Sequence, residues 1–446
     1  MLSKEFLKKK GLKQGDKIIA SYHGNILKGI IIPSHLNDTL VLKLDNGYNV
    51  GMKASDIEKT EKIAGTKGVG KAEKISIKKN PKLPTISILQ IGGTIAARVD
   101  YKSGAVFSSF EPADLVSMFP ELSQIANLES RLVSNMFSED MGFPHYKRIV
   151  KEIEKEMKKD IAGIILPHGT DTMTYTSAAL AFMIEKPRVP IILVGAQRST
   201  DRGSSDAAMN LICAMEFITK TDFAGIGICM HESMNDDYCV ILPPCKTRKL
   251  HTSRRDAFRA VNDTPIARIN YATKEIQFLK KDYLRKDKNA KTIFKSKIEE
   301  KVALIKTHPN IKADLIEHFT KKKMKGLVFE GTGMGQLPIG TPNELCFENP
   351  KIKKAIEKLA KSGCVVVMCS QCIFGRVQMH VYDNAVALVD IGVIPGEDML
   401  AETAFIKLAW LLGNYKNREE VKKLMKENLR GEITPFTRID SSAPTQ

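Results

Sequence analysis

Two short segments of the sequence place a hydroxyl-bearing residue directly after an apolar run and a glycine. Residues 88–96 read ILQIGGTIA and contain Thr94, and residues 164–173 read IILPHGTDTM and contain Thr170. A continuous apolar run of this kind is typical of a buried parallel strand, whose last residues lie at the carboxyl edge of the sheet. Because ligands of open α/β sheets bind outside that edge, the two hydroxyls predict one composite active site.

The residues around the two hydroxyls suit acyl transfer. Thr94 follows Gly92 and Gly93, which permit a sharp turn and leave backbone N–H groups open to a developing oxyanion. A threonine hydroxyl is a weak nucleophile until a neighbouring group takes its proton. In the second segment Asp171 follows Thr170, and a carboxylate there can orient a lysine whose neutral amine serves as the base. Taken alone, either segment is explained as simply by a turn that caps a helix.

The lysine that such a site needs falls within residues 245–258, which read CKTRKLHTSRRDAF and offer Lys246 and Lys249. Spacing alone does not choose between these two side chains. Whichever lysine serves as the base must be uncharged, so desolvation has to outweigh the attraction of the nearby carboxylate for an ammonium.

The elements that must position these residues form an α/β pattern. Over residues 85–280 strands alternate with helices, which predicts a doubly wound domain. Its predicted strands and helices include strands at 161–166, 190–194 and 224–230 and helices at 172–184 and 206–219. Residues 281–446 are predicted to form a second α/β unit. Its predicted elements are strands at 302–306, 326–329 and 364–368 and helices at 312–323, 351–361, 397–412 and 418–429.

The amino-terminal part has a different pattern. Residues 1–63 contain short apolar runs at 17–20, 26–32, 39–44 and 48–52, which predict a small SH3-like β-barrel. Residues 64–84, rich in lysine and glycine, are predicted to be a linker. Within it, residues 65–71 read GTKGVGK and resemble a phosphate-binding loop, but Ala72 stands where a hydroxyl would bind magnesium and no buried strand precedes it. We therefore predict no ATP or metal site in this chain.

Composition narrows the class of protein. A chain of 446 residues with 43% hydrophobic and 27% charged residues is expected to fold as two or three globular domains. No long apolar segment is present, so we expect a cytoplasmic protein with no membrane contact.

The eight cysteines are scattered, and the pair Cys369 and Cys372 favours buried thiols over a zinc site. A net charge of +17 suits an RNA partner, but lysine-rich surfaces that merely keep a protein soluble are as common.

The paired segments GGTIA and HGTDT resemble the two signatures of the L-asparaginase/glutaminase amidohydrolases, and the resemblance runs from about Leu83 to the end of the chain. It implies a larger amino-terminal and a smaller carboxyl-terminal α/β domain, with active sites at a homodimer interface. It also implies that Thr94 is the nucleophile and that Thr170, Asp171 and Lys249 form the second catalytic group.

The same resemblance assigns substrate-binding residues. Ser138 and Glu139 match the segment that binds the α-amino and α-carboxylate groups, although the family often has glutamine or asparagine where Glu139 stands. Tyr101 matches a tyrosine on a mobile lid, and lids of this kind exclude water during the chemistry. Gly169 belongs to the second signature. Gln336 follows a glycine turn, residues 330–335, that a neighbouring protomer can contribute to the site.

The closer resemblance is to one branch of this family, the asparaginase-like D subunits of the archaeal amidotransferases that act on glutamyl-tRNA(Gln). The barrel, residues 98–101 (RVDY) and residues 249–258 carry it. It implies that glutamine or asparagine is hydrolysed to release ammonia, and that a partner, the amidotransferase E subunit, supplies ATP, magnesium and most contacts to tRNA(Gln) within a heterotetramer.

Two other functions remain open at this level. A stand-alone cytosolic L-asparaginase would turn over without a partner. A non-catalytic tRNA-binding scaffold would keep its role after Thr94→Ala, although the intact set of threonines, aspartate and lysine argues against it. The sequence also leaves open which threonine forms the acyl-enzyme and whether glutamine or asparagine is preferred.

Overall fold

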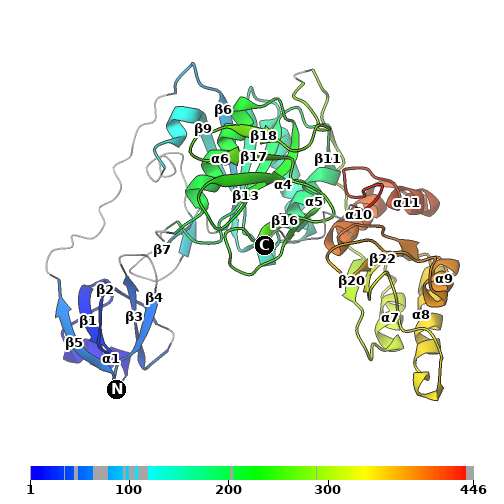
Figure 1. The fold of residues 1–446 in the computed structure, drawn as a ribbon, viewed down its shortest axis with the longest axis horizontal. Helices are drawn as coiled ribbons and strands as arrows, with labels where there is room; N and C mark the ends of the chain where they lie inside the picture. The colour runs from blue at the N-terminus through cyan, green and yellow to red at the C-terminus, as the bar shows by residue number, and fades with distance from the viewer. Residues whose placement is uncertain are drawn as a thin grey trace.

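The computed structural model describes residues 2–34, 36–44, 49–63, 79–93, 97–99, 106–108, 119–200, 204–287 and 289–437. Thr94, Tyr101, residues 45–48, where the pair Asn46 and Gly47 predicts a tight hairpin turn, and the phosphate-loop-like residues 65–71 lie outside these ranges. Figure 1 shows the chain from its amino-terminal sheet (blue), through the large α/β domain (cyan and green), to the smaller carboxyl-terminal domain (yellow to red).

The amino-terminal domain is a small antiparallel sheet with one helix packed on it. Its elements are α1 (Ser3–Lys9), β1 (Lys17–Tyr22), β2 (Asn25–Ile32), β3 (Thr39–Leu44), β4 (Asn49–Lys53) and β5 (Ile57–Lys62). The strand order is β4-β3-β2-β1-β5, and Phe6 of α1 lies in a core with Ile18, Ile31 and Leu42. The sequence pattern missed β5, which has a single buried residue at its start.

The large domain is built on a sheet in the order β18-β17-β14-β13-β12-β10-β6-β9. Its strands are β6 (Thr85–Gly92), β9 (Asn127–Met136), β10 (Gly163–Pro167), β12 (Pro190–Val194), β13 (Gly225–His231), β14 (Tyr238–Leu242), β17 (Ala267–Asn270) and β18 (Ile276–Phe278). From β9 to β13 neighbouring strands are parallel, and from β13 to β18 they are antiparallel. The chain reverses its direction of winding at β6, because β9 lies on one side of β6 and β10 on the other. The carboxyl ends of β6 and β10 therefore form the topological switch point, where open α/β sheets bind ligands.

Helices cover both faces of this sheet, as the doubly wound prediction required. The helices are α3 (Leu122–Ile125), α4 (Phe143–Glu156), α5 (Met173–Met183) and α6 (Ala207–Lys220). Helices α4 and α5 share a buried cluster with Leu89, Ile164 and Leu193, whereas α6 shares one with Ile88 and Ile165. Adjacent strand residues thus point to opposite faces, which is why these strands are continuously apolar.

The carboxyl-terminal domain has a parallel sheet in the order β20-β21-β22-β23. Its elements are β20 (Val302–Lys306), α7 (Ala313–Lys321), β21 (Gly326–Gly331), η3 (Glu344–Cys346), α8 (Asn349–Lys361), β22 (Val365–Ser370), α9 (Asp383–Asp390), β23 (Ile394–Pro395), α10 (Ala401–Asn414) and α11 (Arg418–Met425). Cys369 at the end of β22 is buried, but Cys372 is exposed, so the expectation that both thiols are buried was wrong for Cys372.

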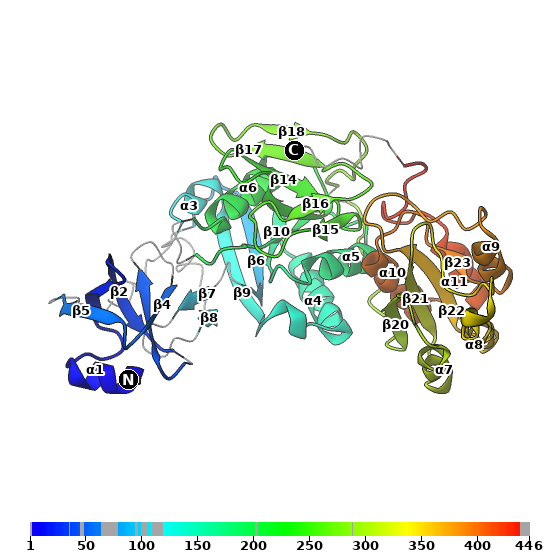
Figure 2. The same ribbon diagram turned by 60° about the horizontal axis from the view of Figure 1, so that its bottom comes forward.

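The two α/β domains share one core. Helix α10 lies between α5 and the carboxyl-terminal sheet (Figure 2), and the Trp410 ring stacks on Phe182 with centroids 5.6 Å apart. After α11, residues 426–437 return to this seam, where the Arg430 guanidinium Nε donates to the carbonyl oxygen of Ala181 at 2.9 Å. Within the described residues, no helix combines the length and the apolar character needed to cross a bilayer.

Short strand pairs complete the structure: β7 (Ala97–Val99) with β8 (Val106–Ser108), β11 (Ile184–Glu185) with β19 (Ile293–Phe294), and β15 (Thr247–Lys249) with β16 (Phe258–Ala260). A turn of 3-10 helix, η2 (Ser138–Asp140), follows β9.

Candidate active site

The turn after β6 needs both of its glycines. Gly92 and Gly93 have φ angles of +134° and +90°, which residues with a side chain rarely adopt. A Cβ atom on Gly93 would lie 2.5 Å from the backbone nitrogen of Gly169, and one on Gly92 would lie 2.1 Å from the carbonyl oxygen of Met136. The turn is therefore pressed against the ends of both neighbouring strands.

The loops after β9 and β10 are also in direct contact. A Cβ atom on Gly169 would lie 2.7 Å from the Cβ of Ser138, and the Thr172 hydroxyl donates to the carbonyl oxygen of Ser138 at 2.6 Å. The Ser138 side chain is buried against this contact. The three strand ends thus converge as the topology predicts.

Lys249 reaches this point from a different part of the chain. Its Nζ lies 2.8 Å from Thr170 Oγ1 and 2.7 Å from Asp171 Oδ1. The Lys249 side chain is 14% exposed and that of Asp171 is 64% exposed, so the amine is largely shielded while the carboxylate faces solvent. The structure also separates the two candidate lysines, because Lys246 is buried and pairs with Asp398.

A cavity of about 610 Å³ opens over these residues. It is lined by Gly93, Asn135, Met136, Phe137, Ser138, Glu139, Asp140, Gly169, Thr170, Asp171, Ala196, Gln197, Lys249 and Thr252. The predicted residues brought together here are Ser138, Glu139, Gly169, Thr170, Asp171 and Lys249. Gln336 follows β21 in the carboxyl-terminal domain and does not line the cavity of this chain, whereas Thr94 and Tyr101 lie outside the described residues.

Several lining residues, among them Asn135 and Gln197, were not predicted from the sequence. Gln197 follows β12, and its backbone N–H donates to Asp206 Oδ2 at 3.0 Å, as that of Arg198 does to Asp206 Oδ1. Asp206 precedes α6, so this helix fixes one wall of the cavity. In the sequence, the one clue to this wall was the carboxylate of Asp206 directly after the polar residues 199–205 (STDRGSS).

The His168 side chain stabilises the turn after β10, which contains Gly169 and Thr170. The fully buried ring bonds to the carbonyl oxygen of Gly169 through Nδ1 at 2.6 Å and to the Thr176 hydroxyl through Nε2 at 2.8 Å. Burial lowers the pKa of His168 to about 4, so the ring is neutral at physiological pH. With Nδ1 as the donor, Nε2 accepts from Thr176 and the turn is held without a buried charge.

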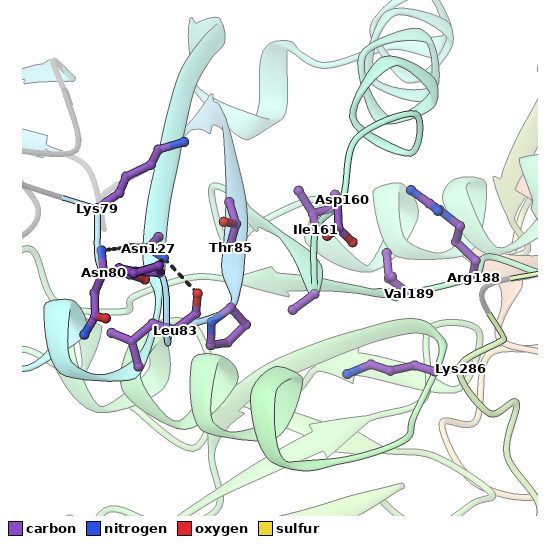
Figure 3. A pocket seen from close by; sticks show the side chains of 13 residues that line it. Lys79, Asn80, Leu83, Thr85, Asn127, Asp160, Ile161, Arg188, Val189 and Lys286 are labelled. Carbon is purple, nitrogen blue, oxygen red and sulfur yellow. Dashed lines mark hydrogen bonds between the residues drawn. The ribbon is translucent and has the colours of Figure 1, made fainter.

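A second cavity of about 620 Å³ lies at the opposite edge of the sheet, near the starts of β6, β10 and β12 (Figure 3). Its cations do not converge: Lys79 pairs with Glu129, and the Lys286 amine donates to the carbonyl oxygens of Ile218 and Thr221. Among the described residues, no group of three or more His, Cys, Asp or Glu side chains is arranged to hold a metal ion. Within the described residues, the contact of the Lys249 amine with a hydroxyl and a carboxylate thus lies at the carboxyl edge and not at this second cavity.

Comparison with known families agrees with this geometry. The family "Asparaginase, N-terminal" matches residues 85–283, "Glutaminase/Asparaginase C-terminal domain" matches residues 301–425, and "GatD N-terminal domain" matches residues 12–63. The thermostable L-asparaginase from Thermococcus kodakarensis has a similar structure, with a TM-score of 0.69 and 27% identity over 78% of this chain and 99% of that one. L-asparaginase I from Vibrio cholerae gives a TM-score of 0.68 and 27% identity over 79% and 99%. These matches define the class as an asparaginase-type amidohydrolase that carries an additional amino-terminal domain.

Curated relatives extend the similarity to the whole chain. The D subunit of glutamyl-tRNA(Gln) amidotransferase from Pyrococcus horikoshii is 44% identical over 99% of both chains, and that from Pyrococcus abyssi is 45% identical over 98% of both. The D subunit from Methanococcus maripaludis is 43% identical over 96% of this chain and 99% of its own. The chain belongs to the family of glutamyl-tRNA(Gln) amidotransferase D subunits.

Proposed function

We propose that this chain hydrolyses the side-chain amide of free glutamine, or of asparagine, and delivers the ammonia to glutamyl-tRNA(Gln) bound by a partner subunit. The observation that carries the proposal is the contact of the Lys249 amine with both the Thr170 hydroxyl and the Asp171 carboxylate at the switch point of the sheet. A base, a hydroxyl and an orienting carboxylate are the groups that a hydroxyl nucleophile needs.

The reaction then proceeds through an acyl-enzyme. The Thr94 hydroxyl attacks the amide carbon, and its proton passes to the uncharged Lys249 amine through the Thr170 hydroxyl. The tetrahedral intermediate collapses, the C–N bond breaks, and the leaving nitrogen takes the proton back to depart as ammonia. Water then cleaves the ester to give the free acid and restores Thr94. Trapping the acyl-enzyme and locating the acyl group by peptide mass tests this assignment. An acyl group on Thr170 would exchange the roles of the two threonines.

The charge of the cavity favours an amino acid as the substrate. Lys249 is the only basic residue among the described residues that line it, against the carboxylates of Glu139, Asp140 and Asp171. The α-ammonium group of glutamine therefore meets an acidic wall, while the buried Ser138 beside Gly169 offers a hydroxyl and backbone groups to the α-carboxylate. The resemblance adds two substrate-binding residues to this proposal, Tyr101 and, from a second copy in a homodimer, Gln336.

The amino-terminal domain favours the amidotransferase over a stand-alone asparaginase. The match covers 99% of each asparaginase structure but only 78% and 79% of this chain. About a fifth of this chain therefore has no counterpart in the asparaginases. The full-length relatives do include that part. By their name they are one subunit of a larger enzyme, which supports a partner subunit. Our proposal assigns ATP, magnesium and most tRNA contacts to that partner, the amidotransferase E subunit, in a cytoplasmic heterotetramer.

The decisive experiment measures glutamine and asparagine hydrolysis by the chain alone, with its partner, and with its partner plus glutamylated tRNA. We expect glutamine hydrolysis to rise at each addition, and Gln-tRNA(Gln) to form only in the complete mixture with ATP. Rapid asparagine hydrolysis that the partner and the tRNA do not change would instead establish the stand-alone asparaginase. Thr94→Ala is the control that must abolish ammonia release in every mixture.

A further inference from the structure

Lys249 is carried by a strand pair that is remote in the sequence from the groups the amine touches. We call residues 246–262 the lysine hairpin. Its strands pair from Thr247 opposite Ala260 to Lys249 opposite Phe258, and the Val261 N–H donates to the carbonyl oxygen of Lys246 at 2.7 Å. An isolated two-stranded hairpin is at best marginally stable in water. The position of the Lys249 amine therefore depends on what holds this hairpin. Phe258 packs in the main core and Arg259 Nη1 donates to the carbonyl oxygen of Glu232, and the open end has contacts of its own.

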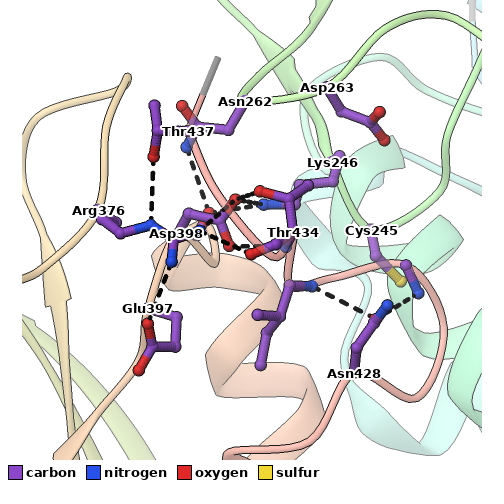
Figure 4. A network of polar contacts seen from close by, with 12 residues as sticks. Cys245, Lys246, Asn262, Asp263, Arg376, Glu397, Asp398, Asn428, Thr434 and Thr437 are labelled. Carbon is purple, nitrogen blue, oxygen red and sulfur yellow. Dashed lines mark hydrogen bonds and ion pairs between the residues drawn. The ribbon is translucent and has the colours of Figure 1, made fainter.

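Both strands of the open end are attached to Asp398, in the loop between β23 and α10. Lys246 Nζ lies 2.7 Å from Asp398 Oδ2 and 2.8 Å from the carbonyl oxygen of the same residue. On the other strand, Asn262 Nδ2 donates to that carbonyl oxygen at 3.3 Å. Figure 4 shows the Lys246 and Asn262 side chains directed at Asp398 from the same side of the network.

The attachment is buried and its hydrogen bonds are satisfied. The side chains of Lys246 and Asp398 are both fully buried, and the Asp398 carboxylate also accepts from the backbone N–H of Thr434 at 3.0 Å and from the Thr434 hydroxyl. Burial lowers the pKa of Lys246, and the Asp398 charge opposes that change. Arg376 Nη2 also lies 3.9 Å from Asp398 Oδ2, so removing Lys246 leaves the carboxylate with a more distant cation, whereas removing the Asp398 charge leaves the buried Lys246 amine with a carbonyl oxygen. Moving the hairpin end away from Asp398 would therefore break a buried ion pair.

Further contacts join strand β15 of the hairpin, and the residue before the hairpin, to the carboxyl-terminal domain. Just before the hairpin, the carbonyl oxygen of Cys245 accepts from the Thr403 hydroxyl at 3.0 Å, and within it Arg248 lies 3.5 Å from the carboxylate of Glu402. Both partners belong to α10. The carboxyl-terminal domain thus fixes the strand that leads to Lys249, while Thr170 and Asp171 belong to the amino-terminal α/β domain.

We propose that Asp398 is a positioning residue that places the Lys249 amine against Thr170 and Asp171 by anchoring the lysine hairpin. The proposal rests on the proposed function, because the placement of Lys249 affects a rate only if that amine takes part in amide hydrolysis. Asp398 itself does not line the cavity and acts through Lys246.

The chain contains a matched control pair. Lys407 Nζ lies 2.7 Å from Glu432 Oε1, and both side chains are fully buried, as in the pair of Lys246 with Asp398. This second pair joins α10 to residues 426–437 and makes no described hydrogen bond or ion pair with the lysine hairpin. Breaking it disturbs a buried ion pair of the same kind and removes no direct contact of the hairpin; its nearest link to the anchor is Thr434, which lies two residues after Glu432 and donates to Asp398.

The test uses the full-length chain together with its partner subunit and compares Asp398→Asn and Lys246→Met with Glu432→Gln and Lys407→Met. For the first two variants we expect kcat for glutamine to fall by about tenfold or more, with KM changed by less than about threefold, because a displaced base slows chemistry more than binding. We also expect faster hydrogen exchange of the backbone amides of residues 247–261. The two control variants should lose thermal stability, with kcat within about twofold of wild type and unchanged hairpin exchange.

Two results from the single variants would overturn the proposal. The first is a loss of kcat that simply follows the loss of Tm across all four variants, and the second is unchanged hairpin exchange in Asp398→Asn. The double variant Lys246→Met/Asp398→Asn removes both charges and should regain thermal stability while kcat stays low; full recovery of kcat would count against anchoring. If the wild-type complex hydrolyses neither glutamine nor asparagine, the proposed function fails, and the exchange data still decide whether Asp398 holds the hairpin.

Discussion

On our proposal Lys249 acts as a base, and a lysine amine accepts a proton only when it is uncharged, which distinguishes this role from that of a fixed cation. An arginine in its place keeps a positive charge and hydrogen-bond donors for Asp171, but a guanidinium does not lose its proton near neutral pH. We expect both Lys249→Met and Lys249→Arg to lower kcat by about 10³-fold or more, with the arginine variant retaining the wild-type Tm to within a few degrees. Steady-state glutamine hydrolysis and thermal unfolding measure the two quantities. Activity of Lys249→Arg above about a tenth of wild type would mean that charge alone is needed.

His168 links the stability of the active-site turn to pH. Its folded-state pKa is lowered from 6.5 to about 4 by burial, although its hydrogen bond to Gly169 acts in the opposite direction. The unfolded chain therefore binds this proton first, so the stability is fully present above pH 6.5 and is lost as the pH falls towards 4. We expect His168 to account for a loss of about 2 kcal/mol in the free energy of unfolding between pH 7 and pH 5.

Urea unfolding at several pH values checks this expectation. The variant His168→Gln should show a shallower dependence on pH, although not a flat one, because burial also lowers the pKa of His231. An unchanged slope in the variant would assign the pH dependence to other groups.

At the scale of single residues, the sequence indicated which residues could react more easily than it indicated which side chains contact one another. Thr170 and Asp171 are adjacent to each other and follow a buried strand, so their local pattern favoured a place at the carboxyl edge of the sheet, although a helix-capping turn explained it as simply. The choice between Lys246 and Lys249 was not local, because it depends on Asp398, which lies 152 positions after Lys246. Gln197 and Asn135 were missed since a polar residue in a loop has the same local pattern whether it faces a cavity or bulk solvent.

At the scale of elements, the glycine turn after β6 shows what a single added atom would do. Gly93 and Gly363 have nearly the same φ angle, +90° and +88°, but an added Cβ meets the backbone of His168 and Gly169 at the first and nothing within 4 Å at the second. We expect Gly363→Ala to cost about 1–2 kcal/mol from its left-handed conformation alone and to keep full activity. Gly93→Ala should cost more and reduce kcat by about 100-fold or more, because the two turns must separate.

Activity assays and urea denaturation of the two glycine variants test this difference. Similar activity in both would show that the contact between the turns is unimportant for catalysis.

Buried parallel strands were the elements that the sequence predicted best. Strand β12 was predicted at its observed bounds, because both of its faces are covered and all of its residues are apolar. Strand β9 was missed: it lies at the edge of the sheet, most of its residues are partly exposed, and it therefore has no apolar run. The strands of the lysine hairpin were missed as well, since three-residue strands are too short for a period to be recognised.

At the scale of the whole molecule, the shared core predicts that the two α/β domains unfold together. Trp410, the single tryptophan of the chain, is 2% exposed, stacks on Phe182 across the seam and donates from Nε1 to the carbonyl oxygen of Lys295 at 2.9 Å. We expect its fluorescence to change in one transition that coincides with the loss of far-ultraviolet circular dichroism and of activity.

The substitution Phe182→Ala should destabilise both domains together, by about 3–5 kcal/mol. A fluorescence transition that precedes the loss of activity would show instead that the carboxyl-terminal domain opens on its own.

The distance in sequence between the lysine hairpin and its anchor also bears on how this protein is made. The ribosome completes residues 246–262 long before it adds Asp398 and Thr434, so a growing chain can form the large sheet while its hairpin is still unanchored. Free ammonia is wasted when no acceptor is near. On our proposal, nascent chains and fragments that end before Asp398 release little of it, and the capacity to do so arises only when synthesis is nearly finished.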